Sequence, residues 1–481
     1  MSKKRMFGAF VVSACLFFGG CGFSFGSNLS SDYSADGFGS ERENSSSQSS
    51  EIIVPAGYTA EIGENMFWEK EDVIVNGYVK QNPDIHIYNY APSIMQTDEN
   101  TCYAYYCSNR YSTDELKDFT YSGVSAAQQG DYKDFPDELG DNRITDYIVC
   151  RKGVKSENVW YWSEKNYVLG PTIGSRTEGE QTCDPNVIGG NFRYDGKVYK
   201  YLMAYLACAT RDNNYNHVCL AVADDPMGPW KKCEKINPLI CYDGPAAEYC
   251  GGDEDLVPDD MKVTAGSEIH WGYGQPSMIN TDKKGKVLMF YSTIKPFKGD
   301  NGWFRGTYTS VARYDFSDLN DIKFDFMPVH MDVNGINEYH GDKFEQAYTT
   351  VNGDYAYDPL KGRIYGIFEN YGGKGLYYAA NKSKSDIAEI GDVFRDYVMY
   401  SWGSNGLKWR KCADIEPVES IYYQGSHNNC IVRDEYGWLL DGKNMEAAVT
   451  GTCPSDTINT EFPGREALYT FRILRKKISL S

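Results

Sequence analysis

One short pattern returns five times along this chain, at intervals of about 75 to 95 residues. Each unit opens a strand, reaches a turn, and then enters a second strand rich in aromatic residues. The openings read Ala-Pro-Ser-Ile at 91–94, Asp-Pro-Asn-Val at 184–187, Gln-Pro-Ser-Met at 275–278, Asn-Gly-Asp-Tyr at 352–355 and His-Asn-Asn-Cys at 427–430. Repeats of this length with several strand signals are typical of sheets set around an axis. The sequence therefore predicts an all-β fold, a five-bladed β-propeller of four-stranded antiparallel blades.

The turns that end the first strands fix the alignment of the five units. A glycine lies ten residues after the opening residue in three units, and in the second unit Gly189 and Gly190 predict a β-bulge. One structural position is then shared by Ala91, Asp184, Gln275, Asn352 and His427. Because the innermost strands of a propeller line its central channel, we expect these side chains to meet at the channel mouth, with a gap beside Ala91. The alternative is that polar residues simply cap each strand at a turn.

The amino-terminal residues indicate export. Lys3, Lys4 and Arg5 precede an apolar run over 6–18, which is too short to span a membrane and is typical of a signal peptide. Gly-Gly-Cys at 19–21 resembles a bacterial lipobox, which implies cleavage before Cys21 and a diacylglycerol thioether on its sulfur. We therefore expect a signal peptide over 1–20 and an exported lipoprotein, anchored at the cell surface or in the periplasm.

Composition divides the rest of the chain and limits its partners. Residues 21–50 carry the lipidated cysteine and a Ser-rich tether with few large apolar residues, 51–83 form a lead-in segment expected to pack on the propeller, and 84–481 form the propeller. The formal net charge of −19 disfavours nucleic acid, and also a polyanionic glycan unless basic residues gather in the pocket. We expect a monomer.

Twelve cysteines follow Cys21, and an even number permits disulfides in an exported chain. Cys208 and Cys219 flank a predicted turn between neighbouring strands, so this pair is the first disulfide candidate. No spacing of Cys and His residues indicates zinc.

Strand signals are clearest in the second unit. Residues 198–208 and 217–223 predict its middle strands, a fourth strand begins near Lys231, and 438–440 predict a second strand in the fifth unit. If the second strands return to the channel mouth, the segments after them overhang it: 108–143, 210–216, 293–307 and 370–375. These segments carry or adjoin Arg110, Arg211 and Glu369, and functional residues concentrate on such loops.

Two segments carry a resemblance to a known family. Residues 178–188 with 192–199 resemble blade two of the five-bladed glycosidases, glycoside hydrolase family 43 and the related fructosidases, in which an Asp-Pro opens this strand beside the substrate. Residues 223–230, Ala-Asp-Asp-Pro-Met-Gly-Pro-Trp, are similar to the phrase that commonly ends that blade. The similarity extends from about residue 84 to the end, and it implies the propeller fold and a carbohydrate substrate.

The resemblance also assigns roles, and the chain departs from two of them. The blade-one aspartate that acts as base or nucleophile is replaced by Ala91, and the blade-three glutamate by Gly274. Asp184 matches the carboxylate that orients the substrate and tunes the pKa of the acid. His427 matches a blade-five histidine that helps to hold a calcium ion or water, so a cation, if one is bound, is expected near it and to be calcium-like.

Glycoside hydrolysis normally needs two carboxyl groups across the scissile bond, so a catalytic pair must be displaced. Glu268 and Glu345 each lie seven residues before the opening of their unit, and Glu369 is the candidate from blade four. Further candidates for acid or base are Glu178, Glu180, His270 and His340. The residues expected to bind substrate are Gln275, Asn352, Asp354, Arg211, Arg110 and Trp271.

Three functions remain open on these grounds. The sequence favours a glycoside hydrolase acting on a neutral oligo- or polysaccharide in an axial pocket. A non-catalytic carbohydrate-binding lipoprotein on the same scaffold is the alternative. A protein-interaction platform is disfavoured, because polar groups gathered in one concave site suit a small hydroxylated ligand.

Overall fold

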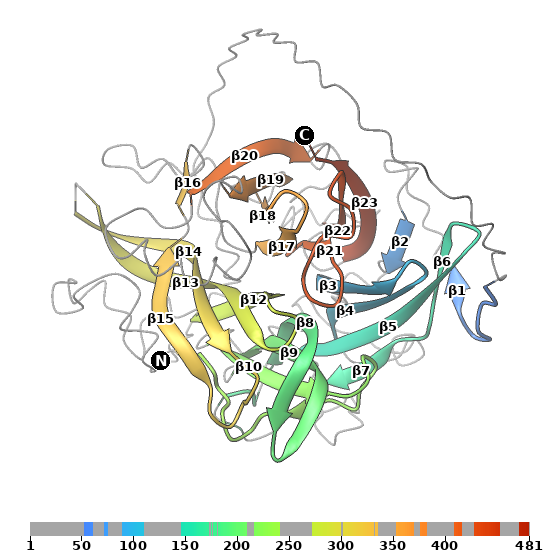
Figure 1. The fold of residues 1–481 in the computed structure, drawn as a ribbon, viewed down its shortest axis with the longest axis horizontal. Helices are drawn as coiled ribbons and strands as arrows, with labels where there is room; N and C mark the ends of the chain where they lie inside the picture. Colours follow the sequence, from blue (N-terminus) through green and yellow to red (C-terminus); the bar gives the residue numbers. More distant parts are fainter. Residues whose placement is uncertain are drawn as a thin grey trace, which may run out of the picture.

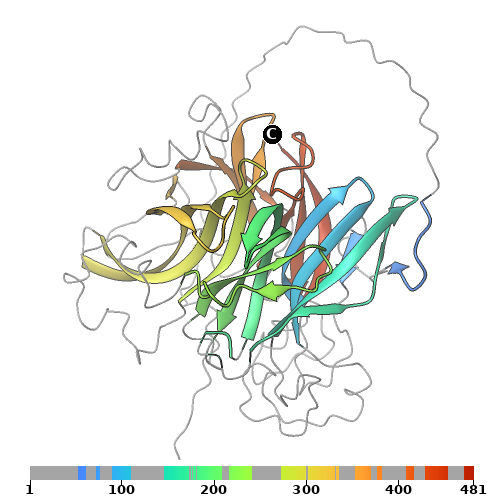
Figure 2. The ribbon, with the colours of Figure 1, turned by 60° about the horizontal axis from the view of Figure 1, so that its bottom comes forward.

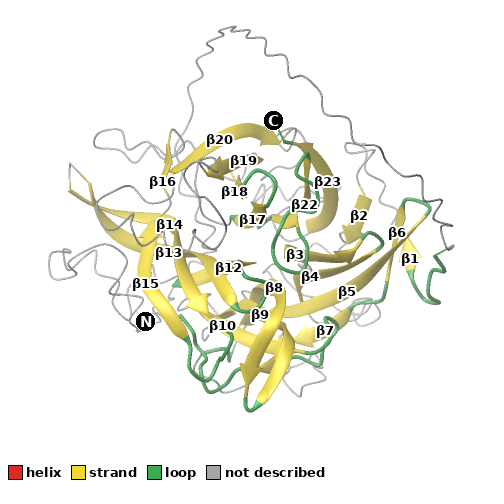
Figure 3. Cartoon of the chain, viewed as in Figure 1, coloured by secondary structure: helices red, strands yellow, loops and turns green. Residues whose placement is uncertain are grey.

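The protein was analysed as a computed structural model that describes residues 52–60, 72–75, 89–109, 146–172, 175, 177–179, 181–208, 216–240, 272–299, 302–330, 332–334, 353–369, 376–381, 408–415, 428–452 and 471–480. These residues form five sheets around a central axis (Figure 1). Strands and loops make up the whole described part (Figure 3). No helix long and apolar enough to cross a membrane is found among the described residues.

The first two blades follow one another along the chain. Blade one contains β3 (Asn89–Asp98), β4 (Thr101–Asn109), β5 (Asp146–Ser156) and β6 (Val159–Trp162), with β1 (Thr59–Ala60) at its outer edge and β7 (Asn166–Leu169) paired to β5. Blade two contains β8 (Gln181–Tyr194), β9 (Lys197–Cys208), β10 (Asn216–Ala223) and β11 (Lys231–Lys232). The predicted strands at 198–208, 217–223 and near Lys231 are confirmed, as is the bulge after Gly189.

The remaining three blades complete the circle. Blade three contains β12 (Tyr273–Asn280), β13 (Lys286–Gly299), β14 (Gly302–Asp315) and β15 (Lys323–His330). Blade four contains β17 (Asp354–Asp358), β18 (Arg363–Glu369), β19 (Leu376–Asn381) and β20 (Lys408–Ile415), with β16 (Asp332–Asn334) parallel to β20. Blade five contains β21 (Cys430–Val432), β22 (Asn444–Thr452), β23 (Phe471–Ser479) and, as its outermost strand, β2 (Asp72–Val75). The propeller fold predicted from the repeat is confirmed.

Two predictions about chain segments are wrong, one of a strand and one of a loop. The second strand of blade five is β22, and residues 438–440 instead belong to the turn before it, where Trp438 forms an isolated bridge to Tyr357. The segment 293–307 is not a loop but the far part of the β13–β14 hairpin, whose pairing continues to Gly299 and Gly302. That hairpin reaches outward from the axis (Figures 1 and 2).

Alternation along the inner strands builds the core between neighbouring blades. Ile94 packs into a cluster shared with blade five, and the next residue, Met95, packs into one shared with blade two. Val187 and Ile188 likewise face blade one and blade three. Successive side chains of a strand point to opposite faces, so each inner strand contributes to two cores. The five inner strands β3, β8, β12, β17 and β21 contact one another in a closed ring.

A turn of blade five closes one end of the axis. The main-chain oxygen of Tyr436 accepts a hydrogen bond from the Asn280 amide of blade three at 2.9 Å, and the oxygen of Gly437 accepts one from Tyr357 of blade four at 3.1 Å. Gly437 has φ +81°, and a Cβ there would lie 2.6 Å from the main-chain oxygen of Met278. Only glycine fits both the conformation and the close approach. The other end of the axis, where the inner strands begin, is called the mouth below.

A buried polar network joins the inner strands between the two ends. Arg433, which is 2% exposed, donates hydrogen bonds to Ser277 Oγ and to the main-chain oxygens of Met278 and Tyr355, at 2.7 to 3.3 Å. Its Nη1 also lies 3.4 Å from Asp354 Oδ1. The carboxylate of Asp354 accepts further hydrogen bonds from Ser277 Oγ, Asn186 Nδ2 and the Ile431 amide. Blades two, three, four and five are thus fastened at one point.

Candidate functional site

Four residues share one unusual backbone conformation at the mouth of the axis. Ala91, Asp184, Gln275 and Asn428 have φ of 51°, 44°, 50° and 50°. In blades one, two and three the pairing with the second strand shifts immediately after this residue. The shared position predicted from the sequence is therefore confirmed for Ala91, Asp184 and Gln275. In blade five the prediction is wrong by one residue, since Asn428 and not His427 takes the position.

This conformation stores strain at the mouth. Non-glycine residues in the left-handed region cost about 1 to 2 kcal/mol each. Asp and Asn tolerate it better than other residues because their short polar side chains bond locally, whereas Ala91 and Gln275 have no such advantage. Strained backbone held by the surrounding fold clusters at functional sites, which makes the mouth the first place to look for function.

Hydrogen bonds bring three of these side chains together across the axis; Asp184, Gln275 and Asn428 are named the axial cluster. Asn428 Nδ2 of blade five donates to Asp184 Oδ1 of blade two at 3.1 Å. Gln275 Nε2 of blade three donates to Asn428 Oδ1 at 3.2 Å. Since blade five is separated from blades two and three by its neighbours, Asn428 reaches across the axis. The cluster brings Asp184 and Gln275 to one centre, as the sequence predicted.

The directions of these hydrogen bonds define what the axial cluster offers a ligand. Asp184 accepts from an amide, so its carboxylate acts as an acceptor. Gln275 uses its amide nitrogen on Asn428, and its buried Oε1 has no hydrogen-bond partner among the described residues. A buried acceptor without a donor costs about 1 to 3 kcal/mol. These hard oxygen atoms suit hydroxyl donors, and they suit calcium better than zinc.

A disulfide fixes the chain beside Asp184. Cys107 at the end of β4 is bonded to Cys183 on β8, with the two Cα atoms 5.3 Å apart. The Asp184 amide nitrogen lies 2.9 Å from Cys107 Sγ. The bond joins blade one to blade two at the mouth, and Asp184 is therefore held by the disulfide on one side and by Pro185 on the other.

The disulfide predicted between Cys208 and Cys219 is wrong. Both thiols are buried, and neither forms a disulfide. Cys208 pairs with Asn216 and Cys219 with Tyr205 in the β9–β10 ladder, so the two cysteines do not face one another. Spacing around a turn does not determine whether two cysteines pair. In this hairpin the register places Cys219 opposite Tyr205, three residues from Cys208.

On the blade-one side of the mouth, Ala91 has apolar neighbours. Ala91 is 4% exposed and packs in a cluster with Cys107, Cys183, Leu206 and Cys208. The gap expected beside Ala91 is therefore filled. A carboxylate at this position would be desolvated, which is costly without a partner.

Asp354 lies in the buried network beneath the mouth. Its two carboxylate oxygens are occupied by Ser277, Asn186, the Ile431 amide and Arg433. These contacts give Asp354 a role in joining the inner strands.

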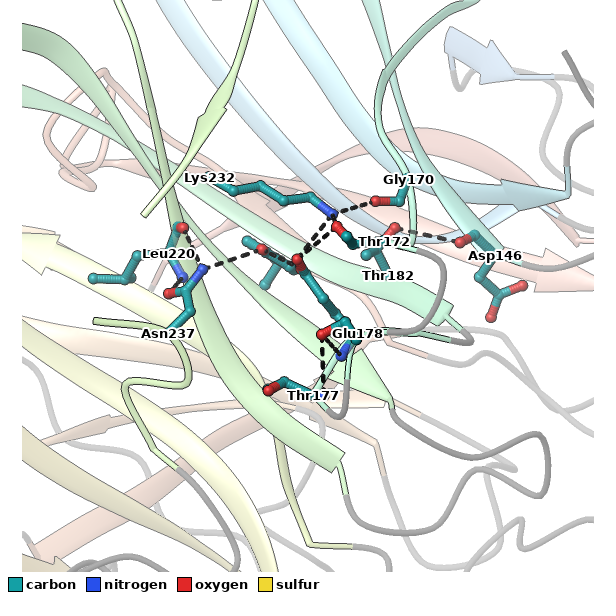
Figure 4. Close-up of polar contacts among 11 residues, drawn as sticks. Asp146, Gly170, Thr172, Thr177, Glu178, Thr182, Leu220, Lys232 and Asn237 are labelled. Atoms are coloured by element: carbon teal, nitrogen blue, oxygen red, sulfur yellow. Dashed lines mark hydrogen bonds and ion pairs between the residues drawn. The ribbon is translucent and has the colours of Figure 1, made fainter. Parts of the chain in front are cut away.

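Glu178 anchors the segment that leads into β8 (Figure 4). Its carboxylate accepts hydrogen bonds from the Tyr205 hydroxyl at 2.7 Å and Thr172 Oγ1 at 2.9 Å, and lies 3.0 Å from Lys232 Nζ. Burial, together with the neighbouring carboxylate, raises the pKa of Tyr205 well above its usual value. These partners give Glu178, one of the candidate acids, a structural role.

Several sequence candidates lie outside the described residues: Cys21, Arg110, Glu180, Arg211, Glu268, His270, Trp271, His340, Glu345, Asn352 and His427. Their roles stay predictions, as does the calcium-like ion near His427. Glu369 ends β18, and its backbone position is described. Strand pairing gives Glu369 the same place on its second strand as Cys107 on β4 and Ser292 on β13, at the mouth.

The sequence did not reveal Asn428, the Cys107–Cys183 bond or Arg433. Asn428 is followed by another Asn where three other openings have Pro, so the signal for its position was the tolerance of Asn for positive φ. Disulfide partners 76 residues apart carry no local signal.

Neither a protein-family model nor a curated protein matches the chain. Solved structures similar to it include the family 117 glycoside hydrolase Zg3597 of Zobellia galactanivorans, at 14% identity and a TM-score of 0.44, covering 85% of this chain and 89% of that one. The α-L-arabinofuranosidase PaAbf62A of Podospora anserina, in complex with cellotriose, is 11% identical with a TM-score of 0.42 and coverage of 85% and 95%. A family 43 β-xylosidase/α-arabinofuranosidase from a compost metagenome, in complex with xylotriose, is 13% identical with a TM-score of 0.41 and coverage of 85% and 96%. This likeness concerns the fold.

Proposed function

We propose that the axial cluster binds a neutral oligo- or polysaccharide at the mouth of the propeller. The observation that supports it is the carboxylate of Asp184 held in a strained backbone beside two amide side chains from other blades. Carboxylate and amide oxygens accept hydrogen bonds from hydroxyl groups, and the amide nitrogens donate to them. A ligand with many hydroxyls and no charge is the class that uses both.

The described part of the mouth supports binding better than hydrolysis. Hydrolysis needs two carboxyl groups at a suitable separation. Among the described side chains near the mouth, Asp184 holds its carboxylate in the axial cluster, buried Asp146 accepts a hydrogen bond from the Tyr90 hydroxyl, and Asp354 is occupied beneath. Binding alone requires only the acceptors and donors already in place.

Asp184→Asn tests this proposal, because it keeps the shape and removes the charge. The affinity for a neutral oligosaccharide from a panel that includes xylotriose and cellotriose should fall by about five- to thirtyfold, as expected for about 1 to 2 kcal/mol. Glu178→Gln is the matched control, since this buried carboxylate of the same blade lies outside the axial cluster. An affinity that Asp184→Asn changes by less than about twofold contradicts a role for the cluster.

Glycoside hydrolysis is the second candidate, and the register of Glu369 favours it. A glutamate on the second strand of blade four at the mouth could supply the second carboxyl group, with Asp184 as its partner. In that case Asp184→Asn and Glu369→Gln should each lower turnover by about a hundredfold or more. Binding of the panel without cleavage, in wild type and both variants, argues for the first candidate.

We also propose that the chain is exported and held to a membrane by a lipid on Cys21. The support is the basic and apolar amino-terminal sequence ending in Gly-Gly-Cys. Metabolic labelling with palmitate should mark the wild-type protein and not Cys21→Ser, and the variant should leave the membrane fraction. Labelling that persists in Cys21→Ser would contradict this.

A further inference from the structure

A second concave site lies on the outside of the propeller, between blades one and two. It has a volume of about 460 Å³, and its walls come from the end of β7 with the residues after it, the turn after β8, and β11. The lining includes the apolar side chains of Leu169, Pro171 and Trp230, the lysines Lys231 and Lys235, and the acids Asp195 and Glu234. We name it the outer groove. None of its residues belongs to the axial cluster.

Two lysines of the outer groove, Lys231 and Lys235, are paired with one acid of its lining, Asp195, and the other acid, Glu234, is exposed. Lys231 Nζ lies 3.0 Å from Asp195 Oδ2, and Lys235 pairs with the other oxygen of the same carboxylate. The side chains of Lys231 and Lys235 are 47% and 68% exposed, while Asp195 is 26% exposed. Two ammonium groups therefore share one carboxylate and remain open to solvent. In a chain with a formal net charge of −19, these two exposed ammonium groups are cationic groups that a carboxylate of a ligand can contact.

Lys232 also lines the outer groove, and its ammonium group is occupied by three partners (Figure 4). Its Nζ donates to the Gly170 main-chain oxygen and to Thr172 Oγ1, both at 2.6 Å, and it forms the ion pair with buried Glu178. These contacts hold the segment after β7 against blade two. Lys232 thus fixes the wall of the groove and has no donor left for a ligand. The ammonium groups that a ligand can reach are those of Lys231 and Lys235.

Trp230 gives the outer groove a fixed aromatic wall. Its Nε1 donates to the Pro226 main-chain oxygen at 3.2 Å, and its ring meets Tyr105 edge-on with centroids 6.1 Å apart. Gly228 has φ +89°, and a Cβ there would lie 3.1 Å from Trp230 Cδ1. The ring is therefore held in place, and it remains partly exposed. Rigid aromatic groups contribute apolar contact area at a low cost in side-chain entropy.

We propose that the outer groove binds a sugar unit that bears a carboxylate, a uronate of a glycan. The apolar C–H face of such a sugar fits the wall of Trp230, Leu169 and Pro171, and its carboxylate would lie beside Lys231 and Lys235. The carboxylate of the ligand then competes with Asp195 for the same two ammonium groups. Removing the Asp195 carboxylate should therefore strengthen ligand binding, whereas a purely structural ion-pair cluster predicts no such gain.

Binding is measured by calorimetric titration of the whole exported chain with trigalacturonate and with galactotriose, its uncharged counterpart. The wild type should bind the acidic trisaccharide at least about tenfold more tightly at low ionic strength, and the preference should shrink in about 0.5 M salt because exposed charges are screened. Asp195→Asn should raise the affinity for trigalacturonate by about threefold or more, because it frees both ammonium groups. Lys231→Gln combined with Lys235→Gln should abolish the preference.

Matched variants separate this proposal from the axial one. Lys283→Gln removes a lysine that lies over the Trp438 ring elsewhere on the molecule, with Nζ 4.1 Å from the ring centroid, and should leave the preference intact. Asp184→Asn should also leave it intact. Equal affinity for the two trisaccharides, no binding up to about 10 mM, a weaker affinity in Asp195→Asn, or a preference that survives the double lysine variant would each overturn the proposal.

Discussion

Arg433 is expected to be the residue whose loss destabilises this propeller most. Its guanidinium donates to Ser277 and to two main-chain oxygens on blades three and four, and it forms a buried ion pair with Asp354. Arg433→Met fills part of the volume but leaves these acceptors without their donor. Breaking a buried pair from one side costs about 3 to 5 kcal/mol, so the free energy of unfolding should fall by that amount.

The assay is equilibrium unfolding in urea, followed by tryptophan fluorescence. Arg475→Met is the matched control, because Arg475 pairs with Glu446 at 2.5 Å but that glutamate is 30% exposed. The free energy of unfolding should fall distinctly less in this control, because Glu446 stays hydrated. A loss below about 1 kcal/mol in Arg433→Met, or an equal loss in both variants, would refute the argument that the axial network fastens the blades.

Three further outcomes follow from the same contacts. Gly437→Ala should lower the free energy of unfolding by at least about 1 to 2 kcal/mol, from the positive φ alone, and a loss within error would show that the axis is not closed by that turn. Reducing the Cys107–Cys183 bond, or replacing both cysteines by Ser, should cost about 2 to 4 kcal/mol, measured by the same urea titration, whereas an unchanged midpoint would contradict a bond in the native protein. Burial raises the pKa of the Cys102 and Cys233 thiols to about 12, so they stay protonated at pH 8 and should react with iodoacetamide only after unfolding; labelling of the native protein would contradict this.

The fold was largely predictable because its information is local and repeated. The five openings, the turn glycines and the alternation of aromatic and small residues each occur in several units, so an error in one unit leaves the others intact. The error at Asn428 arose where a unit lacks the Pro after the strained residue and has a shorter inner strand before its turn. The wrong prediction of a strand at 438–440 has the same cause.

The mouth was only partly predictable because its contacts join distant segments. Asp184 and Gln275 were found by their shared register, yet nothing in their own strands indicates that Asn428 bridges them across the axis. Asp354 looked like a ligand residue, since the sequence does not show that Arg433 lies beside it. Likewise the disulfide fills the space beside Ala91 that the register alone left open.

A crystal structure of the protein with a neutral trisaccharide from the panel above would locate the bound sugar directly. Sugar hydroxyls should lie within hydrogen-bond distance, about 2.7 to 3.2 Å, of the Asp184 carboxylate and of Gln275 Oε1. The backbone of the axial cluster should keep its positive φ. A neutral sugar bound only in the outer groove, with the mouth occupied by water alone, would contradict binding at the axial cluster.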